Sequence, residues 1–352
     1  MTEDHCDESA LAYACDRIVR DYMCVKRGES VVITTDSAHD QQAVRALYLA
    51  ASAAGAKPVI LTVPQLPFQG SLADPYLSDV TVAAVANSDV WFDMTFPYLA
   101  GSKVYNAALE TRRTRCLELA DLTPAGITRL FGFVDLDELF TLQVALDELV
   151  TASVGKPGRV TSANGTDFEF VIGKPATRKL RRIDEPGLYT PPGSAVIYPE
   201  DDSVRGKVRF DFAYHEYYTE LDEPVELEID RRIVAVKGGR TDYMPMERAL
   251  RRAARGEYGS IIHLSIGFHP AARLGGRSFI EDIRVTGSNA IGLGIPWWKP
   301  GGGENHPDGV LPMQSMWIDG RCVVEDGRIV WPAVSEQAAR FAGNFIPTLS
   351  PT

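Results

Sequence analysis

A regular alternation of short apolar runs and helical segments over the first 120 residues is the feature that most constrains the fold. Four runs have the length and the β-branched or aromatic content of buried strands, namely SVVITT (30–35), PVILTV (58–63), DVWFDMT (89–95) and RCLELA (115–120). The segments with helical character lie at 8–26, 39–56, 78–87 and from about 102. Strands joined by helices of this length run parallel, so we expect a parallel sheet with helices on its faces.

The pattern changes after a further predicted helix at 135–152. Residues 158–173 form two alternating runs around Asn164-Gly165, a dipeptide that favours a tight hairpin turn. Paired runs of the same kind recur at 225–239 and 315–331. The second part is therefore predicted to be rich in antiparallel strands, with two more helices at about 245–255 and 335–343.

The length of the chain suggests two domains, because 352 residues exceed the roughly 150 of a typical domain. The breaker-rich segment Gly155-Lys156-Pro157-Gly158 separates the two patterns. We expect an α/β domain with a parallel sheet over 1–155 and an α+β domain rich in antiparallel strands over 156–352.

Charge and composition exclude several classes of function. The net charge of −11 makes the surface repel nucleic acid and acidic membranes. No stretch approaches the roughly 20 apolar residues of a membrane helix, and the start MTEDHCDES is acidic where a secretory signal is basic and then apolar. We therefore expect a cytoplasmic protein that acts on a small molecule.

Cysteine and glycine patterns exclude further classes. The chain has five cysteines without CxxC spacing, which indicates neither a disulfide framework nor a zinc knuckle. No GxGxxG motif follows the first predicted strand, so a dinucleotide cofactor is not expected.

The loop GGGENHPDGVLP (301–312) holds the clearest candidate for chemistry. Residues two apart on an extended backbone project to the same side, so His306 and Asp308 can converge on one point. With a second histidine they would form the set of two imidazoles and one carboxylate that suits ferrous iron in oxygen-activating enzymes. On spacing alone His-x-Asp is a weak motif, and ordinary loop residues account for it more often than a metal site does. His263, on the apolar run GSIIHLSIGFHP, is by itself compatible with a hydrogen-bonded core residue.

Residues 257–330 resemble the C-terminal region of the 2,5-dihydroxypyridine 5,6-dioxygenases, mononuclear iron enzymes whose fold is shared with aminopeptidase T type metallopeptidases. That family has a strand histidine followed by glycine and then Asn-Pro-Ala-Ala-Arg; here His263 is followed by Gly267 and by HPAAR (269–273). A His-x-Asp pair and a two-strand ending follow at matching spacing. The resemblance implies Fe(II) ligands at His263, His306 and Asp308, with Mn(II) or Zn(II) as alternatives and O2 as co-substrate.

The resemblance also implies a reaction, the cleavage of a C–C bond in a hydroxylated aromatic or similar electron-rich molecule. Departures from the family pattern fall in the substrate pocket. The stretch MTFPYLAG (94–101) lacks a histidine that ring-opening members carry, GLYTPPGSAV (187–196) replaces a segment rich in tryptophan and histidine, and His269 replaces an asparagine. We therefore expect the metal site to be kept and the substrate to differ.

Several residues are candidates for the remaining roles, each with a structural role as its alternative. A general base needs hydrogen-bond reach and a suitable pKa, and the candidates are His215, His269 and Glu304, with Glu200 as a further carboxylate. The candidates for substrate contact are Tyr189, Arg273, Trp297 and Pro97. Homo-oligomers are common in the family, so we expect one here.

Two other functions stay open. A hydrolase of the aminopeptidase T type uses two metal ions and needs further ligands, including a tyrosine where this chain has Pro270 and a bridging glutamate for which only Glu257 or Glu200 could serve. A small-molecule binding protein that kept the fold would hold no metal tightly.

Overall fold

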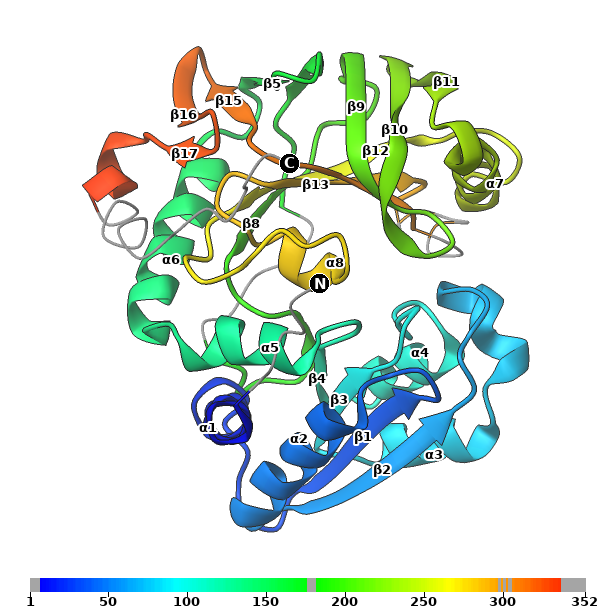
Figure 1. Cartoon of the computed structure of the whole chain (residues 1–352), viewed down its shortest axis with the longest axis vertical. Helices are drawn as coiled ribbons and strands as arrows, with labels where there is room; N and C mark the ends of the chain where they lie inside the picture. Colours follow the sequence, from blue (N-terminus) through cyan, green and yellow to red (C-terminus); the bar gives the residue numbers. More distant parts are fainter. Residues whose placement is uncertain (1–6, 176–181, 297–298, 300–301, 303–305, 337–352) are drawn as a thin grey trace.

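The computed structural model describes residues 7–175, 182–296, 299, 302 and 306–336, and it contains two sheets (Figure 1). The first sheet has the strand order β2-β1-β3-β4-β7, and all of its neighbours pair in parallel. Its strands are β1 (Ser30–Asp36), β2 (Lys57–Val63), β3 (Val90–Met94), β4 (Arg115–Glu118) and β7 (Gly187–Tyr189). The predicted parallel sheet is confirmed.

The helices of the first part begin where the sequence places a side chain that can accept hydrogen bonds from the first turn. They are α1 (Glu8–Arg17), α2 (Gln41–Ala53), α3 (Asp79–Ala86), α4 (Lys103–Glu110), α5 (Pro124–Ile127) and α6 (Leu136–Ala152). Each is preceded by an aspartate, serine or threonine whose oxygen accepts from a free N–H group of that turn. Short π-helical turns at Ile18–Tyr22 and Thr128–Gly132 and a 3-10 turn at Gly70–Tyr76 complete this part.

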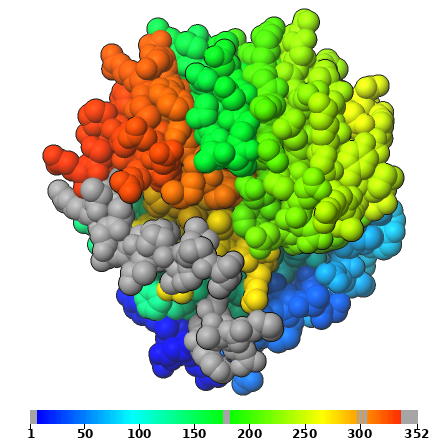
Figure 2. Space-filling model, turned by 45° about the horizontal axis from the view of Figure 1, so that its top comes forward, coloured from blue at the N-terminus to red at the C-terminus, as the bar shows by residue number. Residues whose placement is uncertain are grey.

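The second sheet is antiparallel and follows the order β17-β16-β15-β5-β6-β9-β14-β13-β12-β8, with β10 and β11 branching from β9. Its strands are β5 (Pro157–Thr161), β6 (Asp167–Val171), β8 (Ser194–Ile197), β9 (Arg205–Tyr214), β10 (Tyr218–Asp230), β11 (Arg232–Gly238), β12 (Ser260–Gly267), β13 (Asn289–Gly294), β14 (Asp308–Leu311), β15 (Ser315–Ile318), β16 (Arg321–Glu325) and β17 (Arg328–Ile329). The remaining elements are a 3-10 turn at Arg240–Asp242, α7 (Tyr243–Ala253) and α8 (Phe279–Asp282). In the view of Figure 2, the residues of this second part, coloured green to orange, lie above the blue residues of the first part.

The expected fold class is confirmed, since a parallel α/β part is joined to an antiparallel part. The boundary near residue 155 stays a prediction, because β7 returns to the first sheet and pairs with β4 after β5 and β6 have joined the second. The predicted helix at 335–343 lies mostly outside the described residues. Within the described residues, no helix has the length and apolar character needed to cross a membrane.

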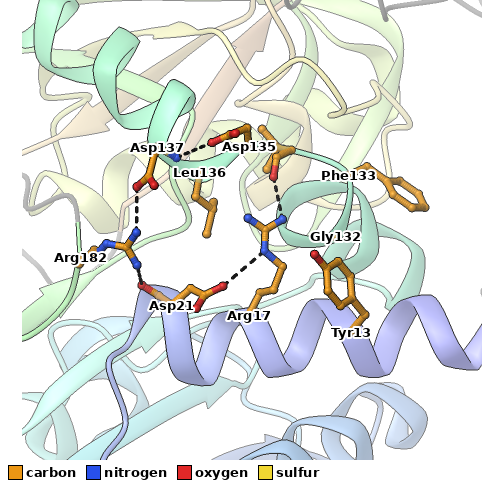
Figure 3. A pocket seen from close by; sticks show the side chains of 10 residues that line it. Tyr13, Arg17, Asp21, Gly132, Phe133, Asp135, Leu136, Asp137 and Arg182 are labelled. Carbon is orange, nitrogen blue, oxygen red and sulfur yellow. Dashed lines mark hydrogen bonds and ion pairs between the residues drawn. The ribbon is translucent and has the colours of Figure 1, made fainter.

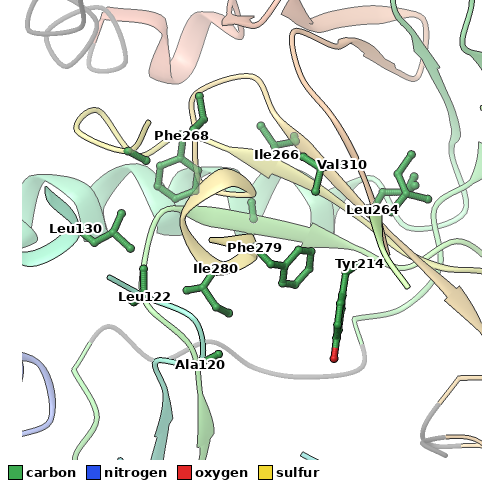
Figure 4. Packing of buried hydrophobic residues seen from close by; sticks show 14 of the residues in the cluster. Ala120, Leu122, Leu130, Tyr214, Leu264, Ile266, Phe268, Phe279, Ile280 and Val310 are labelled. Atoms are coloured by element: carbon green, nitrogen blue, oxygen red, sulfur yellow. The ribbon is translucent and has the colours of Figure 1, made fainter. Parts of the chain in front are cut away.

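The two parts share one apolar core and are joined by polar contacts. Leu122 and Leu130 of the first part pack in the same cluster as Phe268 and Ile280 of the second (Figure 4). The carboxylate of Asp121 accepts hydrogen bonds from the first turn of α8. Its partners are Phe279 N at 2.5 Å, Ile280 N at 3.2 Å and Ser278 Oγ at 3.1 Å. These contacts hold α8 against the first part.

Two acids lie side by side near the carboxyl ends of β3 and β4. Asp93 and Glu118 are register partners, and both are buried. Asp93 accepts from Thr34, Thr95 and Leu99, whereas no described group hydrogen-bonds Glu118 Oε1. Burial raises the pKa of Glu118 to about 8, with a further rise from Asp93. Glu118 therefore carries its proton at neutral pH.

This proton predicts a dependence of stability on pH. Between the unfolded pKa of about 4.3 and the folded pKa of about 8, the folded chain holds a proton that the unfolded chain has released, so Glu118 lowers the free energy of unfolding as pH rises. We expect Glu118→Gln to remove up to about 1.4 kcal/mol per pH unit from that slope. Urea titrations at pH 6, 7 and 8 measure it.

The matched control is Glu257→Gln, because Glu257 is an exposed glutamate in the loop before β12. It should leave the slope of the wild type unchanged. If the Glu118→Gln and wild-type curves run parallel across this range, Glu118 is ionised in the folded chain and the prediction is wrong.

Candidate metal centre

The register of four adjacent strands places one row of residues across the second sheet. His263 on β12 pairs with Gly292 on β13, Gly292 pairs with Asp308 on β14, and Asp308 pairs with Tyr214 on β9. Directly opposed residues on neighbouring strands project to the same face. His263 and Asp308 therefore face each other across a strand whose residue between them has no side chain.

Gly292 provides the space in which the imidazoles lie. A Cβ atom at this position would lie 2.3 Å from Nε2 of His263 and 2.8 Å from Cε1 of His306. Both contacts are shorter than a real Cβ atom tolerates. His306 reaches this space from the segment before β14, which is held to β13 by a hydrogen bond from Leu293 N to Pro307 O of 2.9 Å.

The donor atoms of His263, His306 and Asp308 lie close to one another. The two Nε2 atoms are 3.0 Å apart, and Nε2 of His263 lies 3.4 Å from Asp308 Oδ1. Nε2 of His306 lies 3.5 Å from Asp308 Oδ2. Ligand atoms bound to one ion at about 2.1 Å lie about 3.0–3.4 Å apart. Within the described residues, this is the one group of three such side chains whose donor atoms meet.

The electrostatics of the row suit a bound cation. Asp308 is buried, and neither of its carboxylate oxygens accepts a hydrogen bond from any described group. Burial raises the pKa of Asp308 well above its usual value and lowers the pKa of His306 to about 4, so the His306 imidazole is neutral at pH 7. A buried carboxylate without donors is costly, and a divalent ion would offset that cost. Two imidazoles and a carboxylate fit Fe(II), Mn(II) or Zn(II).

The histidines predicted as bases lie in internal hydrogen-bond networks. His269 is fully buried, its Nε2 lies 3.0 Å from Leu130 O, and its Nδ1 accepts from Ala271 N at 3.2 Å. Burial lowers the pKa of His269 to about 3. In His215, Nδ1 accepts from Glu216 N, whereas the buried Nε2 lies 3.5 Å from Asp242 Oδ1 and hydrogen-bonds no described group. Both ring nitrogens of His269 thus have internal contacts, whereas one nitrogen of His215 does not, and the catalytic role of either residue stays a prediction.

The predicted substrate contacts are dispersed. Tyr189 lies on β7 and donates its hydroxyl to Glu185 O at 3.0 Å, whereas the side chain of Arg273 is exposed. Pro97 is buried in the loop after β3, with a cis peptide bond before it. Trp297 and Glu304 lie outside the described residues.

The sequence analysis missed Gly292 and Tyr214. The signal for Gly292 is the glycine inside the strand NAIGLG (289–294), since such a glycine often marks a close approach of other atoms. Nothing local marks Tyr214, because its place beside Asp308 depends on strand pairing.

A separate hollow of about 630 Å³ lies on the first part of the chain (Figure 3). Its two arginines already have internal partners. Arg17 donates to Phe131 O and Val134 O, and Arg182 donates to Asp21 O and Asp137 Oδ1. None of the three donors of the candidate metal centre lines it.

Comparison with solved structures defines the class of fold. The chain superposes on 2,5-dihydroxypyridine dioxygenase from Pseudomonas putida KT2440 with a TM-score of 0.72 at 20% identity, over 94% of this chain and 99% of that one. It superposes on AmpT from Thermus thermophilus with a TM-score of 0.62 at 13% identity, over 92% of this chain and 100% of that one. The protein therefore has the two-part aminopeptidase T-like fold.

The family follows from the sequence. The family model NicX, described as 2,5-dihydroxypyridine 5,6-dioxygenase, matches residues 19–331. The chain belongs to this dioxygenase family. No curated protein matches it in sequence.

The space above Gly292 predicts the effect of a single methyl group. Gly292→Ala should displace the imidazole of His263 and weaken metal binding at least about tenfold, because small misplacements of ligands have effects of this size. Equilibrium dialysis of metal-free chain against Fe(II) without oxygen, followed by metal analysis, measures the change.

Gly275→Ala is the matched control, since a Cβ atom there would meet nothing within 4 Å. It should bind Fe(II) as the wild type does. Equal affinity for Fe(II) in the Gly292→Ala and wild-type chains would contradict the packing argument.

Proposed function

We propose that the protein is a mononuclear non-heme Fe(II) dioxygenase that uses O2 to cleave a C–C bond in a hydroxylated aromatic or heteroaromatic ring, with both oxygen atoms entering the product. The observation that carries the proposal is the buried carboxylate of Asp308 between the imidazoles of His263 and His306. Family membership supports the reaction type, and the donor set supports iron.

Iron in such a site supplies open coordination positions for an electron-rich substrate and for O2, together with electron transfer between them. The residues of the chain hold the ion and fix the orientation of its ligands. With a cation bound, Asp308 would balance one unit of its charge, and His306 contributes a neutral imidazole because burial lowers its pKa. The ring of Tyr198 packs edge-on against that of His263, with centroids 6.5 Å apart, and limits its rotation.

A general base would take a proton from a hydroxyl of the substrate as it binds. His269 uses both of its ring nitrogens internally, whereas His215 accepts from the Glu216 amide at Nδ1 and has a buried Nε2 without a hydrogen bond. We therefore propose Glu304, two residues before His306, and His215 as the bases to test first, with His269 as the third candidate. The proposed substrate contacts remain Tyr189, Arg273, Trp297 and Pro97, and the proposed assembly remains a homo-oligomer.

The fold of AmpT makes a metal-dependent hydrolase the second candidate. A two-metal site needs ligands beyond the three donors of the row. Glu257 and Glu200, which could supply a bridging carboxylate, are both exposed. The described residues thus favour a single metal ion, which supports the dioxygenase proposal over the hydrolase.

Substitution of the carboxylate of Asp308 by an amide tests this function. Protein purified without oxygen should hold about one iron per chain and consume O2 when offered a hydroxylated pyridine or a hydroxylated aromatic acid. Asp308→Asn should reduce bound iron and O2 uptake by more than about 100-fold, because a neutral amide does not balance the charge of the ion.

Asp319→Asn provides the control, because Asp319 lies in an exposed turn between β15 and β16. It should leave both measurements unchanged. Two zinc or manganese ions per chain, with peptide hydrolysis and no O2 uptake, would support the hydrolase and reject the dioxygenase. If the wild type binds no metal, both enzyme functions are rejected.

A further inference from the structure

Two buried carboxylates fix the loop that follows β3. Oδ2 of Asp36, at the end of β1, accepts a hydrogen bond from Phe96 N at 2.8 Å. Oδ2 of Asp93, on β3, accepts from Leu99 N at 2.9 Å. Both acids are almost fully buried, so they are poorly screened by water. The backbone on either side of Tyr98 is thus held at two points.

This loop contacts the row that contains Asp308. The rings of Phe96 and Tyr98 lie 5.1 Å and 5.9 Å from the ring of Tyr214, which is the strand neighbour of Asp308. Tyr214 is itself fixed, because its hydroxyl donates to Gln69 Oε1 at 3.0 Å. Figure 4 shows this hydroxyl turned away from Leu264 and Val310 of the second sheet. The first part of the chain therefore reaches the candidate metal centre through this aromatic cluster.

The hydroxyl of Tyr98 is not used inside the aromatic cluster. The hydroxyls of Tyr22, Tyr214 and Tyr218 each donate to an internal acceptor. In the described part of the chain, no group hydrogen-bonds the hydroxyl of Tyr98, although this side chain is half-buried. The hydroxyl is not among the buried side-chain atoms that lack a partner, so solvent reaches it. It is therefore available to donate to a molecule that binds beside the aromatic cluster.

The pKa of Tyr98 is raised well above its usual value. Burial is the largest cause, and the charge of Asp308 is the second. The hydroxyl is therefore protonated throughout the physiological range and can only donate to an oxygen anion. The geometry agrees, because the ring of Tyr98 lies 5.9 Å from that of Tyr214 and Tyr214 is the strand neighbour of Asp308, so a ligand held at Asp308 would lie beside the cluster that contains Tyr98.

We propose that Tyr98 is a specificity-determining residue, whose hydroxyl donates a hydrogen bond to an oxygen of the ring substrate held at His263, His306 and Asp308. The inference rests on the proposed function, because it takes the row as the place where the substrate binds. The ligand class is a planar ring with an ionised hydroxyl or a carbonyl oxygen on the side facing β3. A site built around such a donor discriminates against analogues that lack the acceptor.

Binding in the absence of O2 tests the proposal without turnover. Iron-loaded wild type and Tyr98→Phe are titrated anaerobically with 2,5-dihydroxypyridine, catechol and 3,4-dihydroxybenzoate, and the dissociation constants are read from absorbance changes. Iron content is measured on the same samples. Tyr98→Phe should keep its iron and bind the tightest of these probes about five- to twentyfold more weakly.

Tyr105→Phe is the matched control. Tyr105 is a half-buried tyrosine on α4 of the same part of the chain, and it packs against a different apolar cluster. It should bind the probes as the wild type does. An equal loss of affinity in both variants would mean a general packing effect and would overturn the proposal.

The outcomes separate the two proposals. If the wild type binds iron and a probe, and Tyr98→Phe binds that probe equally well, the role of Tyr98 is wrong while the metal site stands. If iron-loaded wild type binds none of the probes, the proposed function and the role of Tyr98 fall together. Loss of iron in Tyr98→Phe would assign the residue to the metal site and overturn its role in specificity.

Discussion

The candidate centre depends on the alignment of three strands that places a glycine between His263 and Asp308. A slip of one residue in either pairing would move one of these side chains to the other face of the sheet. The space above Gly292 then determines how closely the imidazoles approach. Burial of Asp308 follows from the same alignment, because the row lies inside the molecule, and it leaves a negative charge that only a cation or a proton can balance.

The candidate centre also depends on the first part of the chain being held in a fixed position against this row. The Asp121 contacts with α8 and the Arg129–Glu281 pair, with hydrogen bonds of 2.6 and 2.9 Å, join the two parts at buried positions. Buried charged contacts resist shifts, because breaking one leaves an uncompensated charge. Loops at the carboxyl ends of the parallel strands then contact the row, as is general for ligand sites in open α/β sheets.

The shared fold of a dioxygenase and an aminopeptidase shows why fold and function must be argued separately. In this chain the distinction depends on the number of donors in the row and on the residues that face it. Three donors meet in the described residues, and the exposed positions of Glu200 and Glu257 leave them without a second carboxylate group.

Local sequence determined the strands and helices of the first part and the hairpin at Asn164-Gly165, because apolar periodicity, capping residues and Asn-Gly turns act within a few residues. It did not predict β7, β8, β9 or β14. The His-x-Asp spacing, with the family resemblance, was enough to pair His306 and Asp308 with His263. Only the tertiary structure decided that Gly292 separates them, that β7 joins the first sheet and that Tyr98 faces Tyr214. These contacts join segments far apart in the chain, and their distances are set by strand register and packing, which no local pattern encodes.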